Sequence, residues 1–191
     1  MRDGMIAGQP SLFAIESEIT QAFERPSQRG LGFFVIHLMS RCYGIKSPSN
    51  TMLAVSFDEV GRRISGRGEH KAPFAEAAAM DIANAYTGAV YLDHRDNETC
   101  FGMSDAQFTK ILYSSRLVWA PDGDEAFDDS SYVLHFDVED RVRLIAFKRP
   151  NGLVDPASVQ ETWLAADTFY DILRQWRERF MAEWESLPKS N

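Results

Sequence analysis

The sequence Tyr132-Val-Leu-His-Phe-Asp-Val-Glu-Asp-Arg-Val-Arg-Leu-Ile-Ala-Phe147 contains two apolar runs on either side of a short acidic connection. In both runs the side chains alternate with the period of two that is typical of a β-strand. The connection Glu139-Asp140 is short enough to join two neighbouring antiparallel strands. This stretch therefore predicts a β-hairpin over residues 132–138 and 142–147.

Further strands are expected on both sides of this hairpin. Residues 117–119 are apolar and predict a short strand, and a further strand is expected near residues 159–164. Near the N-terminus, Phe13, Ile15, Ser17 and Ile19 recur at alternate positions and predict a half-buried strand. The apolar and aromatic residues 32–43 predict a buried strand that pairs with it, and His37 within that strand is expected to pack in the core.

Four segments have the pattern of helices. They are residues 56–64, with Ser56 and Glu59 as a capping box; residues 74–86, ended by Gly88; residues 105–113, capped by Ser104; and residues 167–187, capped by Asp167. Between the second and third, we expect a short strand over 89–92 and a polar loop that contains His94. The last helix is long, carries an apolar stripe of helical period and ends at Pro188.

Antiparallel strands and hairpins packed with helices, without regular β-α alternation, predict an α+β fold with a long C-terminal helix. No repeat or linker divides the 191 residues, so a single domain over residues 1–191 is expected. Residues 1–4 are an upstream extension if Met5 is the natural start. The first 15 residues lack the continuous apolar run of a secretory signal, which favours a cytoplasmic location.

The net charge of −8 is concentrated in one part of the chain. Eight acids and no Lys or Arg lie between residues 122 and 140, namely Asp122, Asp124, Glu125, Asp128, Asp129, Asp137, Glu139 and Asp140. Two interpretations remain open: a solvated loop that aids solubility, or an electrostatic landing site for a basic partner. The acidic pI near 5.0 argues against nucleic-acid binding, and no apolar run is long enough to span a membrane.

No residue pattern with a defined chemistry is present. A calcium loop starting at Asp122 fails at Ala126, Phe127 and Val133. His37, His70, His94 and His135 are widely separated and no C-x-x-C occurs, so no zinc site is predicted. Cys42 and Cys100 are expected to be buried free thiols. We therefore expect no catalytic residue, no metal and no cofactor.

Three segments resemble the immunity protein 42 family of bacterial polymorphic toxin systems. They are Met5-Ile-Ala-Gly-Gln-Pro-Ser-Leu-Phe-Ala-Ile-Glu16, Leu117-Val-Trp-Ala-Pro-Asp-Gly-Asp-Glu-Ala-Phe-Asp-Asp129, and Trp163-Leu164 followed by Phe169-Tyr170-x-Ile172-Leu173-x-x-Trp176. The resemblance implies a small cytoplasmic α+β protein that binds and neutralises a cognate toxin. It implies no catalytic residues, and it does not say which surface binds the toxin.

The acidic segment offers a surface that such a protein could use. Many toxins act on nucleic acids or phosphates and so present a basic cleft, which carboxylates would attract and cover. The predicted partner-binding residues are Asp122, Asp124, Glu125, Phe127, Asp128, Asp129, Tyr132, Asp137, Glu139 and Asp140. The alternatives are a small adaptor or structural domain, whose acidic loop is merely solvated, and a carboxylate-based metal-binding enzyme. The sequence leaves the oligomeric state open.

Overall fold

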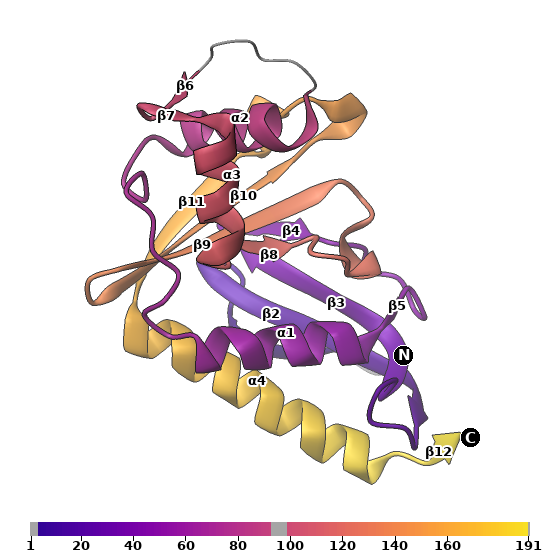
Figure 1. The fold of residues 1–191 in the computed structure, drawn as a ribbon. Coiled ribbons are helices and arrows are strands. Elements are labelled where there is room, and N and C mark those ends of the chain that lie inside the picture. The colour runs from indigo at the N-terminus through magenta and orange to yellow at the C-terminus, as the bar shows by residue number, and fades with distance from the viewer. Residues whose placement is uncertain (1–3, 93–98, 191) are drawn as a thin grey trace.

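Two sheets form the centre of the molecule in a computed structural model that describes residues 4–92 and 99–190 (Figure 1). The first sheet has the order β1 (Met5–Gln9), β2 (Phe13–Phe23), β3 (Gly30–Leu38) and β4 (Arg41–Tyr43), with β5 (Thr51–Met52) beside β3 and β12 (Lys189–Ser190) parallel to β2. The second has the order β11 (Gln160–Ala165), β10 (Arg141–Lys148), β9 (Ser131–Val138) and β8 (Val118–Ala120). A separate small hairpin pairs β6 (Thr99–Cys100) with β7 (Met103–Ser104).

The four helices pack against the sheets, and α4 (Ala166–Ser186) contacts both of them. The first sheet packs against α1 (Leu53–Ser65) and α4, and the second against α2 (Ala79–Tyr91) and α3 (Asp105–Ser114) (Figure 1). Three short 3₁₀ turns lie in the connections: η1 (Glu125–Phe127), η2 (Pro150–Gly152) and η3 (Pro156–Ser158). The predicted α+β class, the antiparallel strands and the long C-terminal helix are confirmed.

The predicted hairpin is β9 paired with β10, and it is buried on both faces. Leu134 and Phe136 belong to the hydrophobic core beneath α2 and α3. Val133, which points to the opposite face, belongs to the core that includes α1 and α4. Because neighbouring side chains of a strand point to opposite faces, β9 contributes to both cores at once.

Two predicted helix starts are wrong, because the residues predicted to cap these helices form contacts with distant parts of the chain instead. α1 begins at Leu53, and Ser56 lies inside the helix, where its hydroxyl bonds to Asp124 instead of capping a backbone N–H. α4 begins at Ala166, and Asp167 lies in its first turn, where it pairs with Arg67 at 2.6 Å. The predicted start of α3 is confirmed, because Ser104 and Gln107 form a capping box.

The segment after α1 also differs from the prediction. Residues 74–78 lie outside any helix, and α2 runs through the predicted stop at Gly88 and over nearly all of the expected strand 89–92. Gly88 is buried. Residues 32–43 form two strands, because the chain turns at Met39-Ser40, where both residues have positive φ. His94 lies outside the described residues.

His37 is half-buried and paired, not packed in the core as predicted. Its Nε2 lies 2.8 Å from Oε2 of Glu16 on the neighbouring strand, and Nζ of Lys46 lies 2.7 Å from Oε1 of the same carboxylate. Burial by itself would raise the pKa of Glu16. The hydrogen bonds and charges of Lys46 and His37 outweigh it and hold that pKa below the ordinary value of 4.5.

This arrangement predicts a loss of stability in acid. A carboxylate with a lowered folded-state pKa contributes stability above its unfolded pKa, and the contribution disappears as the pH falls through the folded-state pKa. We therefore expect the difference in free energy of unfolding between wild type and Glu16→Gln to be largest above pH 4.5 and to shrink below it. Urea denaturation at a series of pH values measures it.

Glu18→Gln is the matched control, because Glu18 lies two residues along the same strand and its side chain has no hydrogen bond or ion pair in the described structure. Its effect should not change over the same pH range. A Glu16→Gln difference that is independent of pH would contradict the prediction.

Candidate functional site

Three of the predicted partner-binding acids are exposed together in residues 121–130, which connect β8 to β9. They are Asp122, Glu125 and Asp128. Their carboxylates form no hydrogen bond or ion pair with any described residue. Like charges in one short segment repel each other and oppose compaction, although the Asp122 charge also favours the protonated form of the buried Arg63. They remain available to a partner of opposite charge.

Buried residues fix the backbone of the same segment. Asp124, 6% exposed, accepts a hydrogen bond of 3.0 Å from Thr51 Oγ1 and another from the Ser56 hydroxyl. Phe127, 3% exposed, packs edge-to-face on Phe34 with 6.1 Å between ring centroids. Both were predicted to contact a partner, but the structure places their side chains in the interior, where they hold the segment against the first sheet and α1.

Asp129 and Tyr132, at the start of β9, also have partners within the chain. A carboxylate oxygen of Asp129 lies 2.6 Å from Lys148 Nζ. The Tyr132 ring is buried, stacks on Phe147 at 5.3 Å and accepts a hydrogen bond from Arg149 at its hydroxyl. Both side chains therefore have partners within the protein, unlike those of the three exposed acids.

The remaining predicted acids lie at the other end of β9. Glu139 and Asp140 are exposed in the β9–β10 turn, and Asp137 is buried just before it. The eight residues of β9 span roughly 23 Å. The acidic run therefore does not form one patch: it forms two exposed groups at opposite ends of β9, and the carboxylates of Asp124 and Asp137 are buried.

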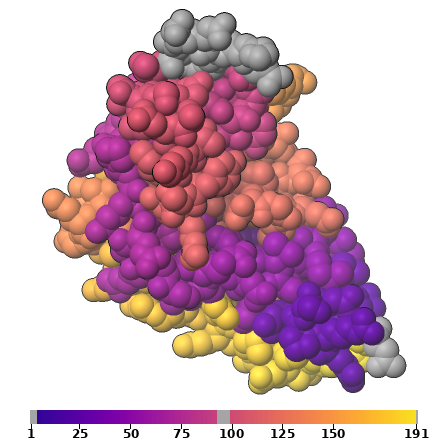
Figure 2. Space-filling model, viewed as in Figure 1, coloured from indigo at the N-terminus to yellow at the C-terminus, as the bar shows by residue number. Residues whose placement is uncertain are grey.

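A cavity of ≈ 160 Å³ is lined by Asp122, one of the three exposed acids, and by residues of α1 and α3. Both helices reach the surface on the face that Figure 2 shows. The lining residues of this cavity are Glu59, Arg62, Arg63, Leu112, Tyr113, Arg116, Val118 and Asp122. Tyr113 is 52% exposed, and Arg62 and Arg116 are exposed as well. Tyr and Arg are the residue types that most often dominate binding energy at protein interfaces. No sequence motif marks these residues, since they come from two helices and a connection.

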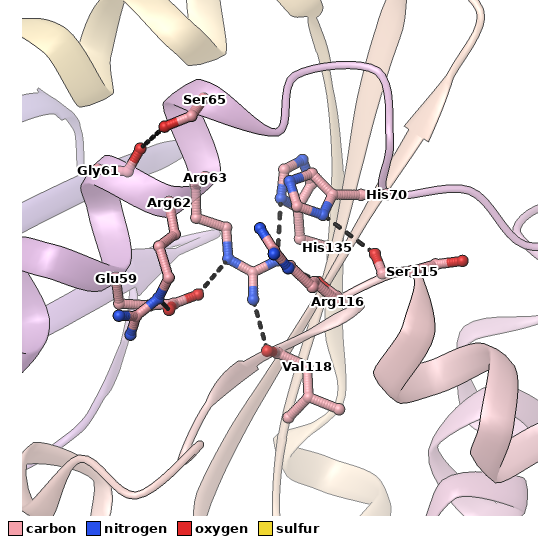
Figure 3. A network of polar contacts seen from close by, with 10 residues as sticks. All are labelled: Glu59, Gly61, Arg62, Arg63, Ser65, His70, Ser115, Arg116, Val118 and His135. Carbon is pink, nitrogen blue, oxygen red and sulfur yellow. Dashed lines mark hydrogen bonds and ion pairs between the residues drawn. The ribbon is translucent and has the colours of Figure 1, made fainter.

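A buried arginine, Arg63, lines this cavity, and Figure 3 shows its hydrogen bonds. Arg63 is 1% exposed, and its Nε donates to Glu59 Oε1 at 2.8 Å, one helical turn earlier. Its terminal nitrogens donate to the backbone carbonyls of Arg116, at 2.6 Å, and Val118. Burial lowers the pKa of Arg63 and the Glu59 charge raises it; an arginine stays protonated in this situation. This network joins α1 to the segment between α3 and β8.

Two histidines that are distant in sequence meet beside Arg63. The His70 and His135 rings lie 4.3 Å apart between centroids, and His135 Nε2 lies 3.5 Å from Asp137 Oδ1. His70, His135 and Asp137 each place one ligand atom within 4.8 Å of the other two. The histidine spacing predicted no such group, and the structure corrects that interpretation, because the segment after α1 folds back onto β9.

The match to known protein families covers nearly the whole of this fold. The model of the family described as immunity protein 42 matches residues 5–179, from the start of β1 through the first two thirds of α4. The chain belongs to the immunity protein 42 family. The resemblance seen in the sequence is confirmed, and the immunity protein is a toxin-neutralising protein of a polymorphic toxin system.

A solved structure of an immunity protein has a similar fold. The crystal structure of CdiI from Burkholderia dolosa AUO158 matches with a TM-score of 0.56 and 16% sequence identity, over 92% of this chain and 99% of that chain. At this identity the likeness concerns the fold. The curated proteins contain no match to this immunity protein. In its described residues, no helix is both long and apolar enough to cross a membrane.

Proposed function

We propose that the immunity protein neutralises its toxin by binding it through Asp122, Glu125 and Asp128 together with the rim of the adjoining cavity, where Tyr113 is exposed. The observation that carries this proposal is the structure of residues 121–130: buried anchors fix the backbone, and three unpaired carboxylates point outward. A surface fixed before binding loses little conformational entropy when the complex forms.

The charge of this surface indicates the chemistry of the partner. Three exposed carboxylates attract a basic surface, speed its approach and repel acidic competitors. A toxin that acts on nucleic acid or phosphate has such a surface around its active site. Covering that surface would inhibit the toxin without a catalytic step, so in this proposal the protein acts by binding alone. It would do so in the cytoplasm, and neither nucleic acid nor a membrane is a proposed partner. Glu139 and Asp140 form a second, smaller contact group.

Charge reversal tests this proposal. The triple variant Asp122→Lys, Glu125→Lys, Asp128→Lys is expected to associate with the cognate toxin about tenfold more slowly or worse at low ionic strength, because steering is lost. The dependence of its association rate on salt should also be weaker than that of wild type. Stopped-flow measurement of the association rate over a range of salt concentrations gives both quantities.

A second triple variant controls for net charge. Glu24, Glu178 and Glu185 are exposed, and reversing all three changes the net charge by the same amount at a distance from the cavity. We expect the association rate of this control, and its dependence on salt, to be much closer to those of wild type than the values of the first variant are. If the first variant associates at the wild-type rate with the wild-type salt dependence, residues 121–130 are not part of the interface.

A further inference from the structure

Three buried side chains of the segment after α1 and of β9 have the composition of a metal site. His70 is 1% exposed, His135 is fully buried and Asp137 is 6% exposed. His135 and Asp137 are two residues apart on β9 and so lie on the same face of the strand. His70 reaches them because its own backbone carbonyl accepts a hydrogen bond of 2.7 Å from the Asp137 amide.

Each histidine has a buried ring nitrogen that forms no hydrogen bond. His70 Nδ1 donates to the Ser115 carbonyl at 3.2 Å, which leaves the lone pair on Nε2, and this Nε2 has no hydrogen-bond partner among the described residues. His135 Nε2 forms no hydrogen bond either, and the nearby Asp137 Oδ1 lies 3.5 Å from it. Buried polar atoms nearly always have a partner, so two unsatisfied nitrogens at one place indicate a missing ligand.

The carboxylate is held in place and charged. Asp137 Oδ2 accepts from the Gly68 amide at 2.8 Å and the His70 amide at 3.2 Å, and Oδ1 accepts from the Tyr170 hydroxyl at 2.8 Å. These three hydrogen bonds favour the charged carboxylate. Hydrogen bonds of this kind orient the ligands of metal centres.

The distances suit a small tetrahedral ion. Zinc binds histidine nitrogen and carboxylate oxygen at roughly 2.0–2.2 Å, which puts neighbouring ligand atoms about 3.4 Å apart. His135 Nε2 and Asp137 Oδ1 are 3.5 Å apart, and one ligand atom from each of the three residues lies within 4.8 Å of the other two. Small side-chain movements would bring the three atoms to the spacing of a coordination triangle.

The local charge suits a cation as well. Asp137 forms no ion pair with Lys or Arg in the described structure. Arg63 opposes a cation, because its NH1 lies 3.4 Å from His135 Nδ1 and donates toward it. Metal binding through His135 Nε2 places the imidazole hydrogen on Nδ1, so it requires this long contact to Arg63 to open. The charge of Arg63, however, is matched by Glu59 and its closer bonds are to other acceptors.

We propose that His70 Nε2, His135 Nε2 and Asp137 Oδ1 bind one divalent ion of the zinc class, which joins the segment after α1 to β9. Two nitrogens and one carboxylate oxygen favour zinc or cobalt over calcium and magnesium, which prefer oxygen ligands. A cavity of ≈ 210 Å³ leads to Asp137 from the surface. It is lined by Arg67, Gly68, Asp137, Glu139, Asp140, Ala165, Ala166 and Asp167, and its carboxylates would attract the ion.

The test is metal binding by protein freed of metal with a chelator. Isothermal titration calorimetry with ZnCl₂ should give one site per chain, and CoCl₂ should produce the visible absorption of tetrahedral cobalt. CaCl₂ at the same concentration should give no heat. In wild type, ¹⁵N spectra should show the Nε2 resonances of His70 and His135 moving on addition of zinc, which requires no variant to fold.

Variants locate the site. His70→Gln and Asp137→Asn should each weaken zinc binding at least about tenfold, and circular dichroism checks that both are folded. His37→Gln is the matched control, since His37 is paired with Glu16 outside this group, and it should bind zinc like wild type. No zinc binding by wild type, or binding that persists unchanged in both variants, would overturn the proposal.

Discussion

Replacing Arg63 with alanine is expected to lower the free energy of unfolding by about 3–5 kcal/mol. The change leaves Glu59 as a buried carboxylate whose remaining partner is the exposed Arg62, and it removes the donors to the carbonyls of Arg116 and Val118. An uncompensated buried charge and unsatisfied backbone groups are among the most costly defects in a protein interior. Urea denaturation followed by circular dichroism measures the loss.

Arg62→Ala is the matched control for that experiment. Arg62 bonds the same carboxylate at 2.7 Å, but its side chain is 51% exposed. Exposed pairs contribute roughly 0–1 kcal/mol, so this variant should retain almost all of the wild-type stability. Equal stability of the two variants would show that burial of Arg63 does not have the energetic role inferred from the structure.

Replacing Trp176 with alanine is expected to cost a similar amount, about 3–5 kcal/mol, by a different mechanism. Trp176 is fully buried in the core where β2, β3, α1 and α4 meet. Its ring packs on Phe34 and Phe180, each at 5.2 Å between centroids, and its Nε1 donates to Ser17 Oγ at 3.0 Å. The variant would have a cavity and a buried hydroxyl deprived of its partner.

Trp184→Ala provides the comparison within the same helix. Trp184 is half-buried, and its Nε1 donates to the carbonyls of Phe23 and Arg29 near the end of the sheet. Since less surface is buried and water can fill the space, we expect a clearly smaller loss. Circular dichroism at increasing urea suits both variants, because it does not depend on tryptophan fluorescence. A larger loss for Trp184→Ala would contradict this account of the core.

Elements with strong local signals could be predicted from the sequence. The β9–β10 hairpin follows from alternation and a short connection, and α3 follows from the capping residue Ser104. The predicted bounds of α2 are wrong for two reasons. The Ala-rich segment has no residue that marks the start of the helix, and Gly88, a residue type that often ends helices, is buried inside this one. The prediction that Ser56 caps a helix is wrong because its hydroxyl donates a long-range hydrogen bond to Asp124.

The candidate site was predictable where it depends on local charge and not where it depends on distant contacts. Asp122, Glu125 and Asp128 could be recognised as acidic and non-structural from the run of like charges. The sequence contains no information on which members of that run point inward, so Asp124 and Asp137 were grouped with them. Residues as far apart as His70 and His135 are brought together only by the packing of the whole fold.

The anchoring of residues 121–130 separates the residues that hold this segment from those at the proposed interface. Asp124 and Phe127 maintain its conformation from inside, whereas the exposed carboxylates form no hydrogen bond or ion pair with a described residue. If the proposed interface is correct, mutations at Asp122, Glu125 and Asp128 change the charge pattern that a toxin encounters while they leave the buried anchors in place. Such a segment would allow an immunity protein to diverge along with a changing toxin, since new specificity could evolve there without compensating mutations in the core.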